Sequence, residues 1–169
     1  MIRTISKIGC FTLLIGAILA STVSKGTADD HSKRPNWKAS VVGTTVPDPD
    51  DDPDDNFNVD IDTFSGTSSH LGRFTAEGSH TLDLTTFMFT GSATYTAANG
   101  DSLDVTYVGQ LFPSDDTDFP FGFTACLWIE SGTGSLSDAQ GSAMFEGGFS
   151  GSPGEFFFDL EGTLHPKGK

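Results

Sequence analysis

The chain has 169 residues, and its 23 aspartates and glutamates outnumber nine lysines and arginines to give a formal net charge of −14. This length fits one ordinary domain with short additions. A surface this negative repels phosphate groups, which argues against nucleic acid as a partner and against binding to anionic membranes.

The N-terminus has the features of a secretory signal peptide over residues 1–28. Arg3 and Lys7 precede an apolar run over 8–20 that is too short to span a membrane. We place cleavage after Ala28, with the small residues at 20–22 as the alternative site; an uncleaved anchor helix and a lipid anchor are weaker alternatives. Residues 29–36 are polar and expected to be disordered.

Processing would therefore yield a secreted or periplasmic protein with no membrane span. Residues 1–28 contain three basic side chains and no acidic one, so the mature chain keeps six basic against 23 acidic residues, a net charge of −17. Cations and basic proteins stay open as partners.

From residue 37 onward, apolar and polar residues alternate in short runs separated by turn residues, and no convincing amphipathic helix appears. Regular spacing of such runs is typical of an all-β sandwich or barrel. We predict an eight-stranded antiparallel up-and-down β-barrel over 37–166. The expected strands are 37–46, 57–68, 71–82, 86–97, 102–111, 120–130, 140–150 and 155–164.

The alternation also predicts which side chains face the interior. In 86–97 the apolar face carries Phe87, Phe89 and Tyr95 together with small residues, a mixture that suits the narrow interior of a small closed barrel. The predicted interior includes Phe74, Phe89, Tyr95, Val105, Phe145, Phe156 and Phe158. The strands of an outer-membrane barrel also alternate between apolar and polar residues. The C-terminal residues 165–169 do not resemble the last strand of such barrels, so we favour a soluble barrel.

The turn between the fourth and fifth strands can be predicted from the faces it must align. A three-residue loop over 98–100 places Tyr95 opposite Leu103 and keeps both apolar faces on one side, whereas a two-residue loop does not. Gly100 then occupies a left-handed position.

The densest acidic segment lies in the loop 47–56 and the start of the strand that follows. Carboxylates are suitable calcium ligands, and Asp50, Asp52 and Asp54 form the candidate weak Ca²⁺ site. The segment lacks the glycine that an EF-hand loop needs, and its prolines favour an extended, solvated loop. We therefore favour the solvated loop over the calcium site.

Five side chains are candidates for ligand binding in or near the barrel. Strand alternation places His70 and His80 on the interior face, where an imidazole is either a proton shuttle, a ligand or simply a hydrogen-bonded core residue. Tyr95 and Tyr107 lie on the apolar face and could offer hydroxyl groups. Arg73 falls on the opposite face, and only reversed faces would make it a cationic anchor inside the barrel.

Three segments resemble known barrel families. Residues 131–141, SGTGSLSDAQG, are similar to a glycine-rich segment of the dirigent and allene oxide cyclase families, and 70–80 and 89–101 resemble a group of uncharacterised exported bacterial proteins. The resemblance covers roughly 34–166 and implies an eight-stranded barrel. It also implies action on small apolar molecules inside the barrel without a metal or organic cofactor. Ser135 stands where the family has a basic residue, so no catalytic residue is carried over.

Two function classes follow. We favour a non-catalytic exported barrel that binds a small apolar molecule or acts at the cell surface. The alternative is a cyclase- or isomerase-like enzyme with its site inside the barrel, which would require a cavity with convergent polar groups.

Overall fold

The alternating segments form eight strands, which we describe from a computed structural model covering residues 36–52 and 54–166. The strands are β1 (Trp37–Pro47), β2 (Phe57–Ser68), β3 (Gly72–Asp83), β4 (Met88–Ala97), β5 (Ser102–Pro113), β6 (Phe121–Gly132), β7 (Gln140–Phe149) and β8 (Gly154–His165). A short 3₁₀ helix, η1 (Gly134–Leu136), lies between β6 and β7. Within the described residues, no helix has the length and apolar character needed to cross a membrane.

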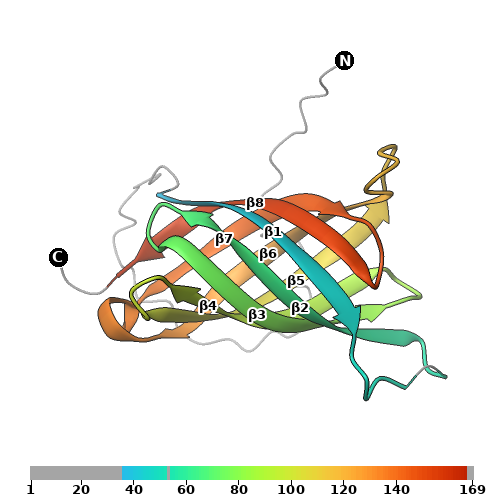
Figure 1. The fold of residues 1–169 in the computed structure, drawn as a ribbon, viewed down its shortest axis with the longest axis horizontal. Helices are drawn as coiled ribbons and strands as arrows, with labels where there is room; N and C mark the ends of the chain where they lie inside the picture. The colour runs from blue at the N-terminus through green and yellow to red at the C-terminus, as the bar shows by residue number, and fades with distance from the viewer. Residues whose placement is uncertain (1–35, 53, 167–169) are drawn as a thin grey trace, which may run out of the picture. The chain divides into compact units, whose positions relative to one another are not determined.

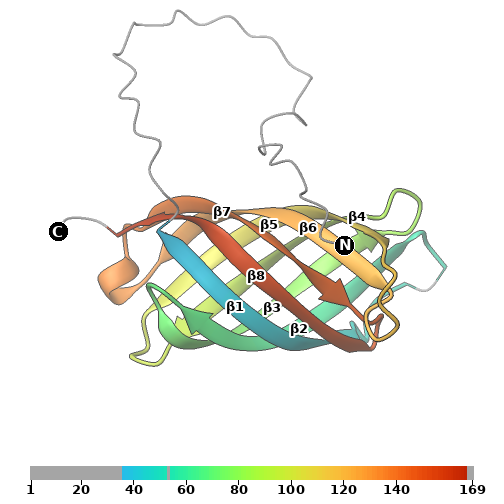
Figure 2. The ribbon, with the colours of Figure 1, turned by 90° about the horizontal axis from the view of Figure 1, so that it is seen from above.

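Each strand pairs with its neighbours in chain order, and β1 pairs with β8 to close the barrel. Both side views show β1 lying next to β8 (Figure 1, Figure 2). All eight pairings are antiparallel, so the predicted eight-stranded antiparallel up-and-down barrel is confirmed. Closure leaves no free sheet edge.

The predicted interior is confirmed, because the residues assigned to it belong to or pack against one apolar core. Phe74, Phe89, Tyr95, Val105, Phe145 and Phe158 are buried, and Phe156 is partly buried and packs against them. The β4–β5 hairpin also follows the prediction, with Tyr95 opposite Leu103 and Gly100 in the left-handed region at φ 88°.

Phe87 differs from the expectation that it continues the inner face of the fourth strand. Its φ is 57°, which breaks the strand alternation, and its side chain is 48% exposed. The preceding Asp83 carboxylate accepts hydrogen bonds from the backbone of Thr85 and Thr86. This turn delays the start of β4 to Met88.

The two ends of the barrel carry different connections. The acidic end carries the loops 48–56, 84–87, 114–120 and 150–153, and loop 48–56 projects beyond the sheet at the right of Figure 1. The closed end carries the turns 69–71 and 98–101 and the segment 133–139 with η1. At the closed end, Trp37, Leu103 and Leu164 are fully buried, and Leu136 of η1 is buried with them.

Candidate functional site

The inner face of β2 is polar at the acidic end, which reverses the usual pattern of a barrel strand. Asp60 and Asp62 are 1% and 5% exposed, whereas Ile61 between them points outward and is 38% exposed. Phe64 further along β2 belongs to the core, and strand alternation then turns the two aspartates inward with it. Burying two carboxylates is costly unless other groups compensate them.

Asp60 is compensated by hydrogen bonds from two neighbouring groups. The Asn58 side-chain amide donates to Oδ2 at 2.6 Å, and the Ser152 hydroxyl in the β7–β8 loop donates to Oδ1. The Ser152 contact joins β2 to the β7–β8 loop at the acidic end.

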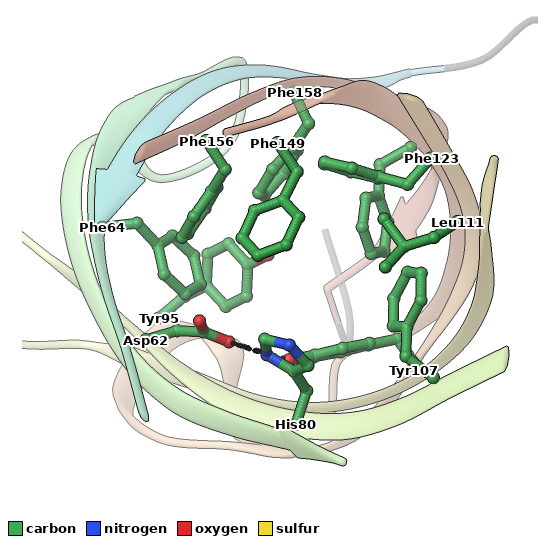
Figure 3. A pocket seen from close by; sticks show the side chains of 12 residues that line it. Asp62, Phe64, His80, Tyr95, Tyr107, Leu111, Phe123, Phe149, Phe156 and Phe158 are labelled. Carbon is green, nitrogen blue, oxygen red and sulfur yellow. Dashed lines mark hydrogen bonds and ion pairs between the residues drawn. The ribbon is translucent and has the colours of Figure 1, made fainter. Parts of the chain in front are cut away.

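Asp62 is joined to His80 on the neighbouring strand β3. His80 Nδ1 lies 2.8 Å from Asp62 Oδ2 (Figure 3). His80 Nε2 lies 3.5 Å from Asp60 Oδ2. The Tyr107 hydroxyl lies 3.4 Å from the same Asp62 Oδ2 and 3.3 Å from the Ser79 carbonyl oxygen. Both imidazole nitrogens therefore face carboxylates, an arrangement that favours the protonated ring.

The surroundings of His80 act on its pKa in opposite directions. Burial, the largest single influence, lowers the pKa, while the hydrogen bond to Asp62 and the charges of Asp62 and Asp60 raise it. The carboxylates prevail, and the pKa of His80 is raised above its ordinary 6.5. Burial, with the charge of Asp62 as a second cause, also raises the pKa of Tyr95 and of Tyr107, so both phenols stay neutral.

This cluster forms one wall of a cavity of about 70 Å³ inside the barrel, which we call the barrel cavity. Its other walls are mainly aromatic, as the close-up shows (Figure 3). The lining residues are Asp62, Phe64, His80, Phe89, Tyr95, Tyr107, Leu111, Phe123, Phe145, Phe149, Phe156 and Phe158. One water molecule needs about 10–15 Å³ of such space, so the cavity suits a molecule of a few heavy atoms rather than a long lipid chain.

A glycine makes room for the tyrosine that reaches this cluster. Gly91 on β4 is paired with Tyr107 on β5, and a Cβ atom at Gly91 would meet the Tyr107 ring and hydroxyl at 2.5 Å. The absence of a side chain at residue 91 therefore lets Tyr107 lie across β4 toward Asp62.

The structure brings together three of the five predicted ligand-binding residues. His80, Tyr95 and Tyr107 line the barrel cavity. The prediction that His70 faces the interior is wrong: it is exposed in the turn 69–71, because β3 begins only at Gly72 and strand alternation does not extend back to it. Arg73 is exposed on the outer face, as strand alternation predicts, so it does not line the barrel cavity.

Sequence reasoning missed Asp60 and Asp62 as interior residues and grouped them with the acidic loop. The usable signal was Phe64, which shares their parity on β2 and belongs with the core aromatics. Val59 and Ile61 point to the opposite assignment. They alternate with the two aspartates and are more apolar, so the pattern suggests that the aspartates face outward.

Three of the six aspartates of loop 48–56 accept hydrogen bonds from nearby backbone N–H groups. Asp48 and Asp52 each accept a hydrogen bond from the backbone N–H two residues later, and Asp55 accepts one from Phe57. Within 36–52 and 54–166, no three His, Cys, Asp or Glu side chains are grouped closely enough to hold a metal ion. Calcium binding by Asp50, Asp52 and Asp54 stays a prediction.

Comparison with known proteins adds no further assignment. No family model, no curated protein and no solved structure matches this chain. Membership of the allene oxide cyclase and dirigent-like barrels therefore stays a prediction, and the site must be interpreted from its own geometry.

Proposed function

We propose that this protein is an exported, non-catalytic barrel that binds a small, largely apolar molecule in the barrel cavity. The observation that carries the proposal is the aromatic cavity with a single polar cluster on one wall. Ligand sites typically combine apolar walls with a few convergent polar groups that fix orientation. We also propose that the barrel belongs with the allene oxide cyclase and dirigent-like barrels and that it requires no cofactor.

Binding can be tested with neutral aromatic probes. We expect toluene and benzyl alcohol to bind with a Kd on the order of 0.1–1 mM, as their few heavy atoms allow. Shifts of cavity-residue signals in NMR titrations would measure this. Leu111→Trp should fill the cavity and abolish binding, whereas Val42→Trp, at a residue exposed on the outer face, should leave binding unchanged. Failure of both probes to bind the unmodified protein would contradict the proposal.

Catalysis by proton transfer is the less well supported alternative. Both nitrogens of His80 face carboxylates, so the ring has no free nitrogen to accept a proton from a substrate. A cyclase or isomerase would have to use Asp62 as its base. Chemical conversion of a bound ligand, lost in Asp62→Asn, would favour the enzyme.

Export is tested separately, because residues 1–28 lie outside the described residues. Mass spectrometry of the secreted protein should show an N-terminus at Asp29 after removal of the signal peptide. A secreted product that still begins at Met1 would contradict this part of the proposal.

A further inference from the structure

The buried groups at the acidic end do not balance in charge. Asp60 and Asp62 contribute two carboxylates, and among the described residues His80 is the one histidine in contact with them. With both carboxylates ionised and His80 protonated, the cluster keeps one net negative charge. A buried charge without a partner is unfavourable, so one further positive charge would complete the cluster.

One carboxylate oxygen is available for that partner. Asp62 Oδ1 is buried and has no hydrogen-bond partner among the described residues. Figure 3 shows this oxygen turned away from His80, toward the phenylalanine side of the cavity. Thr45, directly opposite Asp62 in the β1–β2 pairing, also has a buried hydroxyl without a partner in the described part of the chain, but it does not line the barrel cavity. An unsatisfied carboxylate oxygen on a residue that lines a cavity is what a ligand with N–H donors would satisfy.

The walls beside Asp62 also suit a cation. Phe64 packs edge-on against Tyr95 and Phe156, with ring centroids 5.3 Å and 5.8 Å apart, and all three line the cavity. Aromatic faces attract an ammonium group, especially where water is excluded. The same walls would pack against the apolar body of the ligand.

The field of the protein directs cations toward this end. The loops 48–56 and 114–120 hold nine aspartates at the acidic end. The lysine and arginine of the described residues, Lys38 and Arg73, are the second residues of β1 and β3 and so lie toward the closed end. Single-sign charge around an entrance raises the local concentration of the opposite ion and lowers that of anions such as carboxylates.

We infer that the ligand is a small organic ammonium ion, in which a protonated amine contacts Asp62 Oδ1 and an apolar, ring-sized body lies among the aromatic side chains. This inference rests on the proposed function and names its ligand class. It separates this barrel from one that would take a fatty acid or another organic anion.

A set of isosteric probes isolates the charge. Benzylamine, benzyl alcohol, toluene and benzoate have similar bodies and differ in the group that would meet Asp62. We expect benzylamine to bind about tenfold or more tightly than benzyl alcohol, as befits a hydrogen bond between charged groups, and benzoate to bind not at all. Isothermal titration at neutral pH and constant ionic strength measures all four.

Asp62→Asn supplies the matched test, with Asp159→Asn on the outer face of β8 as its control. We expect Asp62→Asn to lose the preference for benzylamine but retain toluene binding, which also shows that the variant is folded. Asp159→Asn should keep the preference. Equal affinities for benzylamine and benzyl alcohol in the unmodified protein would overturn the inference while leaving the proposed function intact. Binding of none of the probes would overturn both. Competition by millimolar calcium beyond its ionic strength would instead assign Asp62 to an inorganic cation.

Discussion

The interior of the barrel is filled differently at its two ends. At the closed end, Trp37, Leu103 and Leu164 are fully buried, and the Trp37 indole donates a hydrogen bond to Ser68. At the acidic end, the interior holds two carboxylates, a histidine and a cavity. The difference indicates that the closely packed closed end contributes more to the free energy of unfolding, while the acidic end is less closely packed and contains the barrel cavity.

The largest expected effect comes from deleting an aromatic ring at the closed end. Trp37→Ala should lower the free energy of unfolding by about 3–5 kcal/mol, because it leaves a large cavity in a fully packed region. Phe156→Ala, at a partly buried ring beside the existing cavity, should cost about 1–2 kcal/mol. Urea denaturation measures both losses, and equal values would remove the distinction between the ends.

Replacing the polar pair at the acidic end with apolar residues should leave the barrel equally stable or more stable. Asp62→Leu combined with His80→Leu removes a buried ion pair, and such replacements range from neutral to stabilising by about 1–4 kcal/mol. His80→Leu alone should be destabilising, since it leaves Asp60 and Asp62 without the imidazole between them. A double variant that is less stable than the single one would show that the pair serves the fold rather than a ligand.

The stability of the acidic end should depend on pH through His80. Its pKa is raised in the folded protein, so protonated His80 stabilises the fold fully below about pH 6.5. This contribution is lost as the pH rises through the folded pKa, and the melting temperature should fall over that range. His80→Gln should remove this slope, and His70→Gln, which alters an exposed histidine at the other end, should retain it. An unchanged slope in His80→Gln would assign the effect to another group.

The smallest expected effect concerns calcium and loop 48–56. If the loop is only solvated, millimolar calcium should raise the melting temperature by no more than about 2 °C beyond sodium chloride of equal ionic strength. The triple variant Asp50→Asn, Asp52→Asn, Asp54→Asn should then respond like the unmodified protein. A rise of many degrees that the triple variant abolishes would make the loop a cation site.

The strand order and the apolar core were the easier part to predict from the sequence. Regular alternation with aromatic and small residues, as in the strand that holds Phe89 and Tyr95, determines both the fold and the core. Local reasoning also predicted the β4–β5 turn, because only one loop length aligns the two faces. His80, Tyr95 and Tyr107 were found in the same way, from their parity.

The acidic end was harder, because its chemistry depends on contacts between strands distant in sequence. Asp62 meets His80 only through the register of β2 against β3, and Ser152 reaches Asp60 from a loop 92 positions further along the chain. Alternation predicts a face and not a partner. On β2, alternation alone favours the wrong face, since Val59 and Ile61 are more apolar than Asp60 and Asp62.

The pairing of β1 with β8 has a consequence for how the chain folds. β1 cannot complete its backbone hydrogen bonds until β8 has been synthesised and has paired with it. This pairing joins residues as far apart in sequence as Trp37 and Gly162. Contacts over such distances slow folding, and a chain interrupted before β8 would expose two unpaired strand edges to other chains. We therefore expect aggregation to compete mainly with the pairing of β1 and β8. A truncated chain that ends after β7 should be less soluble than any of the single-substitution variants described above.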